Sequence, residues 1–251
     1  MGAVEPLQNL LARHGHLQVY RVAAAQLATE LARDIAGRLQ QAIHARGVAV
    51  LSVSGGKSPI ALFEALRQQP LDWSKLHITL VDERYVPATH EASNTLLVRT
   101  HLLQGPAARA RLHAMVPELN LPLPPLPTLV QNADADLHAL GPADVMVLGV
   151  GADGHTASLF PAAPRLAAAL DPRSPQACVG MALDPPPAAA PHARLTQTLA
   201  QILRSRHLIL PVTGDDKLAA LQQALREPTD RLPVSHLLHQ QHTPLALWLT
   251  A

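Results

Sequence analysis

Val48-Ala-Val-Leu-Ser-Val53, followed directly by Ser54-Gly-Gly-Lys-Ser-Pro59, is the stretch of sequence that decides the fold. The first half is a short apolar run rich in valine, which is typical of a strand buried on both faces of a parallel sheet. The second half breaks that strand. A helical pattern resumes over residues 60–68, and Pro59 stands where the first turn of a helix tolerates proline. The stretch therefore predicts a strand, a glycine-containing turn and a helix in succession.

The same succession recurs along the chain. Further strands are predicted at residues 77–81, 144–150, 207–212 and 245–249, and further helices at residues 22–46, at 94–103, in a short turn after His155 and in a segment that ends at 225. Strands that alternate with helices indicate an α/β protein, so we expect a Rossmann-like, mostly parallel sheet with helices on both faces. Two proline-rich stretches, residues 121–127 and 184–191, are expected to be irregular surface connections. Neither resembles an interdomain linker, so we expect a single domain over residues 1–251.

The composition excludes several classes of protein. Aromatic residues make up only 2% of the chain, so an aliphatic core is expected and a platform of stacking rings for nucleic acid is not. A net charge of +1 creates no broad field for DNA or an anionic membrane. Cys178 is the single cysteine, which suits a reducing compartment. The sequence lacks a run of ~20 apolar residues, and the stretch from Met1 to Arg13 lacks the apolar segment of a signal peptide. We therefore expect a cytoplasmic protein.

Four unusual loops follow predicted strands directly, at residues 54–59, 82–87, 151–155 and 213–217. In a parallel α/β sheet, ligands bind beyond the carboxyl ends of the strands. We therefore expect the four loops to meet at one edge of the sheet and to form a ligand site there. This convergence is a stronger argument than any single loop.

Two of these loops carry groups suited to an anion. Ser54, Gly55 and Gly56 let the backbone approach a ligand closely, and free N–H groups at the start of the next helix favour negative charge. A Gly-Gly turn alone, however, is more often only a tight connection. Arg84 offers planar donors that suit a pair of phosphate oxygens. The alternative for Asp82-Glu83-Arg84 is a surface cluster of salt bridges.

Two more basic residues are candidates for the same ligand. Lys217 lies in the first turn of a predicted helix, where its charge opposes the helix dipole. A bound anion would resolve this conflict, whereas a solvent-exposed lysine would merely tolerate it. Arg194 could bring a second guanidinium to the ligand, although an exposed arginine is the more common case. Ser93-Asn94 is expected to be an ordinary helix-cap pair.

The loop Gly151-Ala-Asp-Gly-His155 is the most informative segment. Histidine titrates near neutrality, so His155 could take a proton from water and later return it to a leaving group. Asp153 either caps the following turn or orients the imidazole, and the residues leave both roles open. The chain has 14 histidines, but none pairs with acidic or cysteine ligands at spacings familiar from metal sites. We expect neither a metal nor a cofactor.

Three segments together resemble the 6-phosphogluconolactonase family. They are Val53-Ser-Gly-Gly-Lys-Ser-Pro59, Val81-Asp-Glu-Arg-Tyr-Val-Pro87 with Ser93-Asn94, and Leu148-Gly-Val-Gly-Ala-Asp-Gly-His-Thr-Ala-Ser-Leu-Phe-Pro161. Arg194-Leu-Thr196 and Gly214-Asp-Asp-Lys217 follow in that family's order. The resemblance covers nearly the whole chain, and its last segment is the most specific.

The resemblance implies hydrolysis of 6-phosphoglucono-lactone to 6-phosphogluconate in the oxidative pentose phosphate pathway. It implies that His155 is the catalytic base. It also implies a set of residues around the phosphate: Ser54, Gly55, Gly56, Arg84 and Lys217. Lys57 departs from the family pattern and adds a possible second positive contact. The expected partner is a small sugar phosphate, bound by a monomer or a weak homodimer.

Two alternatives remain. The glucosamine-6-phosphate deaminases and isomerases share the fold and an Asp-Gly-His segment, but they typically carry Asp-Glu-Tyr where this chain has Asp82-Glu83-Arg84. They also diverge after the histidine, where this chain reads Thr156-Ala-Ser-Leu-Phe160. The other alternative is a non-catalytic sugar-phosphate sensor. Such a protein is expected to carry a DNA-binding segment, and the stretch before the first predicted helix is short.

Overall fold

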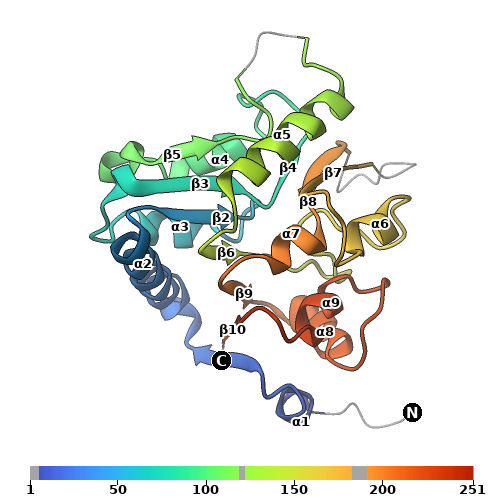
Figure 1. Ribbon diagram of the computed structural model, residues 1–251. Helices are drawn as coiled ribbons and strands as arrows, with labels where there is room; N and C mark the ends of the chain where they lie inside the picture. The colour runs from blue at the N-terminus through green and yellow to red at the C-terminus, as the bar shows by residue number, and fades with distance from the viewer. Residues whose placement is uncertain (1–5, 119–121, 183–190, 251) are drawn as a thin grey trace.

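The computed structural model describes residues 6–118, 122–182 and 191–250. Within these residues, a seven-stranded sheet runs through the middle of the molecule in the order β1-β10-β9-β6-β2-β3-β5 (Figure 1). All neighbouring strands in it are parallel. The strands are β1 (Leu17–Val22), β2 (Ala49–Val53), β3 (Leu76–Leu80), β5 (Arg111–His113), β6 (Val145–Val147), β9 (Leu208–Val212) and β10 (Leu245–Thr250). The predicted fold class is confirmed.

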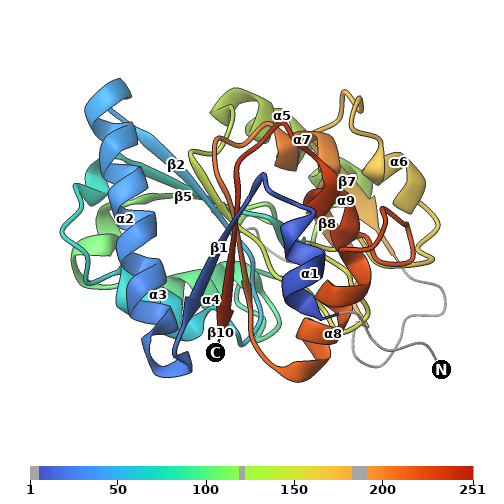
Figure 2. The same cartoon turned by 90° about the horizontal axis from the view of Figure 1, so that it is seen from below.

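Helices cover both faces of this sheet. Successive residues of a strand point to opposite faces, and because strands such as β9 are apolar throughout, both faces must be buried. In β9, Ile209 packs into one hydrophobic cluster, whereas Leu208 and Leu210 pack into the other. Figure 2 shows α2 and α3 to one side of β1 and β10, and α1, α8 and α9 to the other. The helices are α1 (Leu7–Ala12), α2 (Leu27–Arg46), α3 (Ile60–Leu66), α4 (Asn94–His101), α5 (Leu126–Leu140), α6 (Leu166–Leu170), α7 (Leu199–Leu203), α8 (Asp215–Ala224) and α9 (Val234–His239), with short 3-10 turns at Ala24–Gln26, Trp73–Lys75 and Gly105–Arg109. No helix in the described residues combines the length and the apolar character needed to cross a membrane.

A second, antiparallel sheet stands beside the first and was not predicted. It consists of β4 (Asp82–Arg84), β8 (Arg194–Gln197) and β7 (Cys178–Met181), in that order. Gln197 joins the two sheets, because its side-chain amide donates to Ser52 Oγ at 3.1 Å and to the Leu80 carbonyl at 2.8 Å. The second sheet begins two residues after β3 ends, so it carries Arg84 to the edge where the predicted loops meet.

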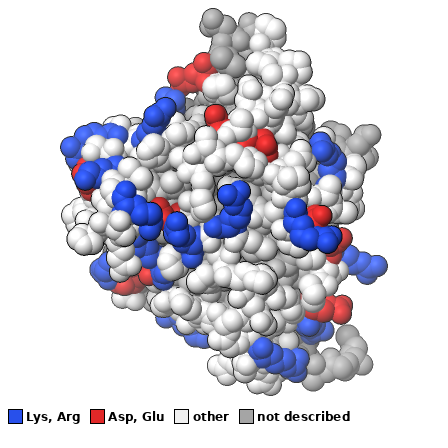
Figure 3. Space-filling view, in the orientation of Figure 1, with Lys and Arg blue, Asp and Glu red and all other residues white. Residues whose placement is uncertain are grey.

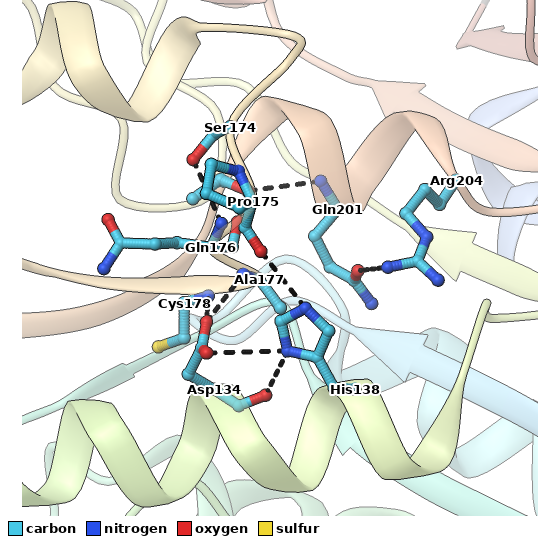
Figure 4. Close-up of polar contacts among 10 residues, drawn as sticks. Asp134, His138, Ser174, Pro175, Gln176, Ala177, Cys178, Gln201 and Arg204 are labelled. Carbon is cyan, nitrogen blue, oxygen red and sulfur yellow. Dashed lines mark hydrogen bonds and ion pairs between the residues drawn. The ribbon is translucent and has the colours of Figure 1, made fainter.

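Helix α5 is fastened to the edge of β7 by an Asp–His pair (Figure 4). Asp134 Oδ1 accepts the backbone N–H groups of Ala177 at 2.6 Å and Cys178 at 2.9 Å. One turn later on α5, Nδ1 of His138 lies 2.8 Å from the Asp134 carbonyl, and Nε2 lies 3.1 Å from the Pro175 carbonyl. The pair therefore satisfies polar backbone groups where the second sheet meets the helix layer.

Three predicted elements differ from the structure by more than one or two residues or in type. The helix predicted over residues 22–46 begins at Leu27, because Val22 belongs to β1 and residues 24–26 form a 3-10 turn. The strand predicted over residues 144–150 is limited to β6, after which the chain leaves the sheet. The helical turn predicted after His155 is a tight turn closed between Thr156 and Leu159. Tertiary contacts hold this turn, since Ser158 donates its N–H to Thr196 Oγ1 and its hydroxyl to Asp82 Oδ2.

Only part of the two proline-rich stretches can be compared with the prediction that they are irregular. Residues 126 and 127, predicted as irregular, are the first two residues of α5, because proline fits the first turn of a helix. Residues 119–121 and 183–190, which include most of the second stretch, lie outside the described residues.

Charges are mixed on the face of the molecule seen in Figure 3. Lys and Arg side chains form separate patches there, and Asp or Glu lies beside several of them. This distribution agrees with the net charge of +1. An anionic ligand would be recognised by a few local cationic groups rather than by a broad field.

Candidate active site

A cavity of about 410 Å³ opens at the carboxyl ends of β2, β6 and β9. Its volume lies in the range of about 300–1,000 Å³ that is usual for small-molecule sites. Each of the four predicted loops contributes to its lining, in chain order Ser54, Gly55 and Gly56, then Arg84, then Gly151 and His155, and then Lys217. The predicted convergence of these loops at one edge of the sheet is confirmed.

His155 lies in the cavity wall and is held from behind by Asp153. Nδ1 of the imidazole lies 2.5 Å from Asp153 Oδ1, and the same oxygen accepts the backbone N–H of His155 at 3.2 Å. An ionised carboxylate can only accept, so Nδ1 carries the proton, and Nε2 of the neutral ring keeps its lone pair. Among the described residues, Nε2 has no hydrogen-bond partner. The ring is therefore arranged to accept a proton through Nε2.

The carboxyl group of Asp153 is ionised in this arrangement. Partial burial raises the pKa of Asp153, but the hydrogen bond and the charge of His155 outweigh burial, and the pKa lies below its ordinary value. Residues 156–159 form a tight turn, so Asp153 has no helix to cap there. Asp153 itself does not line the cavity. Of the two roles that the sequence left open, its contacts support orientation of the imidazole.

Two glycines make room for this pair. A Cβ atom on Gly151 would lie 2.2 Å from His155 Nδ1 and 2.5 Å from Asp153 Oδ1. Gly154 has a φ of 77°, and a Cβ atom there would lie 2.5 Å from Leu232. A larger residue at either position would displace a neighbour, so the spacing Gly-Ala-Asp-Gly-His has a steric cause.

Arg84 enters the cavity from the end of β4. Its Nη1 donates to the Ala92 carbonyl at 2.6 Å and to Asn94 Oδ1 at 2.8 Å. Its Nε is buried, and no partner for it is present in the described residues. The two contacts fix the plane of the guanidinium and use both protons of Nη1. Nη2 has no hydrogen-bond partner among the described residues.

Glu83 is not a surface group of a salt-bridge cluster, which was the alternative for this segment. Its buried carboxylate accepts the backbone N–H groups of Arg84, Asn94 and Thr95 at 2.7–2.8 Å and the Ser93 hydroxyl at 3.1 Å. Burial raises the pKa of Glu83, although these donors act in the opposite direction. Glu83 therefore anchors the start of α4 beside β4.

Lys217 lies in the first turn of α8, as predicted, and reaches back to the glycine turn. Its Nζ donates to Ser58 Oγ at 3.1 Å, and both side chains line the cavity. Helix α8 begins after Gly214, which has a φ of 88°. The lysine of α8 and the hydroxyl that precedes α3 thus meet in the cavity wall.

Besides Asp153, two predicted residues do not line the cavity. The side chain of Lys57 is exposed. Arg194 is only 6% exposed, so it is not the exposed arginine of the default interpretation, and it lies opposite Arg84 in the β4–β8 ladder. Burial lowers the pKa of Arg194, and so does the charge of Arg84, while Asp82 and Glu83 act against this. Arg194 adds positive charge behind Arg84 without lining the cavity.

Comparison with known sequences identifies the family. Residues 23–247 match the family model of glucosamine-6-phosphate isomerases/6-phosphogluconolactonase. The chain is 46% identical over 224 residues to a 6-phosphogluconolactonase of Pseudomonas aeruginosa, an alignment that covers 88% of this chain and 90% of that one. The chain belongs to this family. A 6-phosphogluconolactonase of Neisseria meningitidis serogroup A is 42% identical over 87% of this chain and 92% of its own.

Solved structures of the family have the same fold. A crystal structure of a 6-phosphogluconolactonase from Shewanella baltica superposes with a TM-score of 0.86 at 37% identity, over 95% of this chain and 99% of that one. A monomeric glucosamine-6-phosphate deaminase superposes with a TM-score of 0.74 at 18% identity, which shows a shared fold alone.

Several cavity residues of this family member were not predicted as site residues, and three of them have polar side chains that bear on the site. Asp82, Ser58 and Asn94 all line the cavity. Ser58 stands at the start of a helix, and Asp82 follows a strand, so their positions were a signal that could have found them. The amide of Asn94 could not be placed from sequence, because Ser93-Asn94 at a helix start gives no indication of a contact with Arg84.

Within the described residues, His, Cys, Asp and Glu side chains do not gather in groups of three or more that could hold a metal ion. The three rings of His14, His16 and His239 lie close together, but each directs Nε2 to a backbone carbonyl at 2.8–3.0 Å. These three histidines therefore form hydrogen bonds with the backbone.

Proposed function

We propose that this protein hydrolyses 6-phospho-D-glucono-1,5-lactone to 6-phospho-D-gluconate, the reaction of the oxidative branch of the pentose phosphate pathway. Relatives at 36–46% identity that align over 79–89% of this chain are 6-phosphogluconolactonases. The observation that carries the proposal is the position of His155. Its ring is held by Asp153 and lines the same cavity as Arg84 and Lys217.

In the proposed reaction, His155 first acts as a base. Water attacks the lactone carbonyl carbon while Nε2 of the imidazole takes one of its protons, and a tetrahedral intermediate forms. The bond from that carbon to the ring oxygen then breaks, and the imidazolium returns the proton to the departing oxygen. Asp153 stabilises the imidazolium through Nδ1–H, as an ionised partner does in other acid–base pairs. The net change is the addition of one water molecule.

The phosphate is assigned to the cationic side chains. Lys217 with Ser58, the N–H groups of the glycine turn, and Nη2 of Arg84 are the donors available in the cavity. Charge-assisted hydrogen bonds of this kind are shorter and stronger than neutral ones. An anion next to Lys217 would also offset the conflict between this lysine and the dipole of α8.

The direct test uses freshly prepared lactone and purified protein, with formation of 6-phosphogluconate followed by a coupled dehydrogenase. We expect a rate well above spontaneous hydrolysis, unchanged after exhaustive chelation. A rate equal to the background would contradict the proposed function. A rate that vanishes with chelator and returns with zinc would contradict the proposed mechanism alone.

Glucosamine-6-phosphate serves as the second substrate in that test. An isomerase or deaminase must move a proton between two carbons, which needs a second acid or base. We expect no release of ammonia from this substrate.

A single domain, a cytoplasmic location and a monomeric or weakly dimeric state remain predictions from the sequence.

A further inference from the structure

Asn94 has an environment that its position in the sequence does not explain. It is the first residue of α4, and only 1% of it is exposed. The capping role belongs to Ser93, whose hydroxyl accepts the Leu96 N–H at 3.3 Å. The side chain of Asn94 turns away from its own helix. Its Nδ2 donates to the Asp82 carbonyl at 2.8 Å, and its Oδ1 accepts from Arg84 at 2.8 Å.

The same amide packs against the glycine turn. A Cβ atom on Gly55 would lie 1.8 Å from Asn94 Oδ1 and 2.1 Å from its amide carbon. Gly55 is not among the residues with positive φ, so its backbone conformation does not require glycine. The requirement is for space. One side chain therefore contacts the glycine turn, the backbone of Asp82 and the guanidinium of Arg84, and all four residues line the cavity.

The consequence for Arg84 is a loss of freedom. A long arginine side chain loses conformational entropy when it is fixed. Asn94 and the Ala92 carbonyl hold Nη1 before any ligand arrives. Groups held in the binding geometry bind more tightly because the cost of ordering them is not incurred at the moment of binding.

We propose that Asn94 is a positioning residue for the substrate anion. It fixes the guanidinium plane of Arg84 and sets the distance between that guanidinium and the glycine turn. The proposal rests on the proposed function for the identity of the substrate. It assigns Asn94 no part in proton transfer, so its removal affects substrate binding and leaves the chemical step at His155 intact.

The test is a double-mutant cycle of Asn94→Ala and Arg84→Ala. We expect Asn94→Ala to raise KM for the phosphorylated lactone about tenfold, which is the low end for a hydrogen bond to a charged group, while kcat changes little. In the Arg84→Ala background, the same substitution should raise KM less than about twofold, since interacting residues are not additive. An equal increase in both backgrounds, or a fall in kcat at constant KM, would overturn the proposal.

Gly55→Ala tests the same contact from the opposite side and leaves the sequence of α4 unchanged. The added methyl group meets Asn94 Oδ1, so we expect a similar rise in KM. The combination of Gly55→Ala with Asn94→Ala removes the clash, and its KM should match that of Asn94→Ala alone. If the KM increases of the two single variants multiply in the double variant, the contact between Gly55 and Asn94 does not position Arg84.

Ser93→Ala is the matched control for stability. It removes the N-cap of the same helix and a contact with Glu83, but Ser93 does not line the cavity. We expect thermal unfolding at a lower temperature and an unchanged KM. If Ser93→Ala raises KM as much as Asn94→Ala does, the effect of Asn94 is only structural.

Calorimetric binding of 6-phosphogluconate separates this proposal from the proposed function. Asn94→Ala should weaken that binding about tenfold, whether or not the wild type is catalytically active. A wild type without activity that still binds 6-phosphogluconate, and binds it less tightly after Asn94→Ala, would contradict only the function. An active wild type whose binding is unaffected by the substitution would contradict only the role of Asn94.

Discussion

Two Asp–His pairs in this protein look alike in composition and differ in what they can do. In both, an aspartate precedes a histidine closely, and Nδ1 lies near the carboxylate, at 2.5 Å for Asp153–His155 and 3.5 Å for Asp134–His138. The side chain of His138 is the more exposed, 41% against 32% for His155. Exposure therefore does not distinguish His155, the histidine that we propose as the base, from His138.

The two pairs differ in whether Nε2 of the histidine has a hydrogen-bond partner, and in which other groups the carboxylate accepts hydrogen bonds from. Nε2 of His138 lies 3.1 Å from the Pro175 carbonyl, and Asp134 spends one oxygen on two backbone N–H groups (Figure 4). Nε2 of His155 has no hydrogen-bond partner among the described residues, and the ring lines the cavity. The carboxylate of Asp153 contacts only His155 there. A histidine can exchange protons with a ligand when one nitrogen is held and the other is free.

Substitution of the two histidines should separate the pairs by the largest margin. His155→Asn keeps a polar group of similar size but removes the titratable nitrogen, so kcat should fall by roughly 10²–10⁴. That fall corresponds to about 3–5.5 kcal/mol of transition-state stabilisation. KM should change little. His138→Asn should leave kcat unchanged and lower the free energy of unfolding by about 1 kcal/mol. A folded His155→Asn variant that keeps more than about a third of the activity would remove His155 from the mechanism.

Variants in the cavity that touch neither pair should change substrate binding alone. Arg84→Ala and Lys217→Ala should each lower kcat/KM roughly 10- to 150-fold, the range expected for a charge-assisted hydrogen bond. The loss should be much smaller with unphosphorylated gluconolactone. Lys57→Ala is the matched control, since Lys57 is exposed and does not line the cavity. Equal losses on both substrates would mean that these cations serve the fold or the reaction centre.

Substitution of the two aspartates should give a smaller contrast. Asp153→Asn should lower kcat about 10- to 100-fold, the usual effect of losing a group that orients another. Asp134→Asn should lower stability without changing kcat. Because the pKa of Asp153 lies below its ordinary value, its ionised contact with His155 is present above that value and is lost only as the pH falls below about 4. A fall in kcat/KM that occurs on acidification but above about pH 4 must therefore come from a group other than Asp153. If Asp153→Asn has full activity, the imidazole needs no orienting partner.

Cys178 gives a chemical readout of the structural pair. Burial raises the pKa of its thiol to about 12, and the charge of Asp134 contributes to this. The native protein should therefore react with thiol reagents very slowly, because the thiolate is the reactive form. Asp134→Asn should speed this reaction about fivefold, in line with a loss of about 1 kcal/mol in local stability. Asp153→Asn should not change it. A fast reaction in the wild type would mean that the α5–β7 contact opens readily.

The comparison also explains which parts of the molecule the sequence could predict. The strands of the larger sheet that carry apolar runs, such as β2 and β9, were found because buried parallel strands need continuous hydrophobic residues. The second sheet was missed, because β4 reads Asp82-Glu83-Arg84 and the buried strand β8 carries Arg194 and Gln197. Their burial depends on long-range partners such as Ser52 and Leu80.

The same limit applies to the site. The succession of strand, loop and helix was enough to predict that the four loops meet at one edge of the sheet. The loop around His155 was enough to single it out among the histidines. Nothing local, however, distinguishes Asp134 from Asp153, since the carbonyl that occupies Nε2 of His138 comes from Pro175, 37 residues away. Likewise, the contact between Asn94 and Gly55 joins segments that only the folded chain brings together.

The most direct test of the central claim is the protonation state of the two ring nitrogens of His155, read by nitrogen NMR of histidine-labelled protein and assigned with His155→Asn. At a pH where the imidazole is neutral, we predict a proton on Nδ1 and a bare Nε2, because Asp153 can only accept. Addition of 6-phosphogluconate should perturb the Nε2 resonance and leave the Nδ1 proton in place. A proton on Nε2 in the free protein, with Nδ1 bare, would contradict the account, since Nε2 could not then take a proton from water.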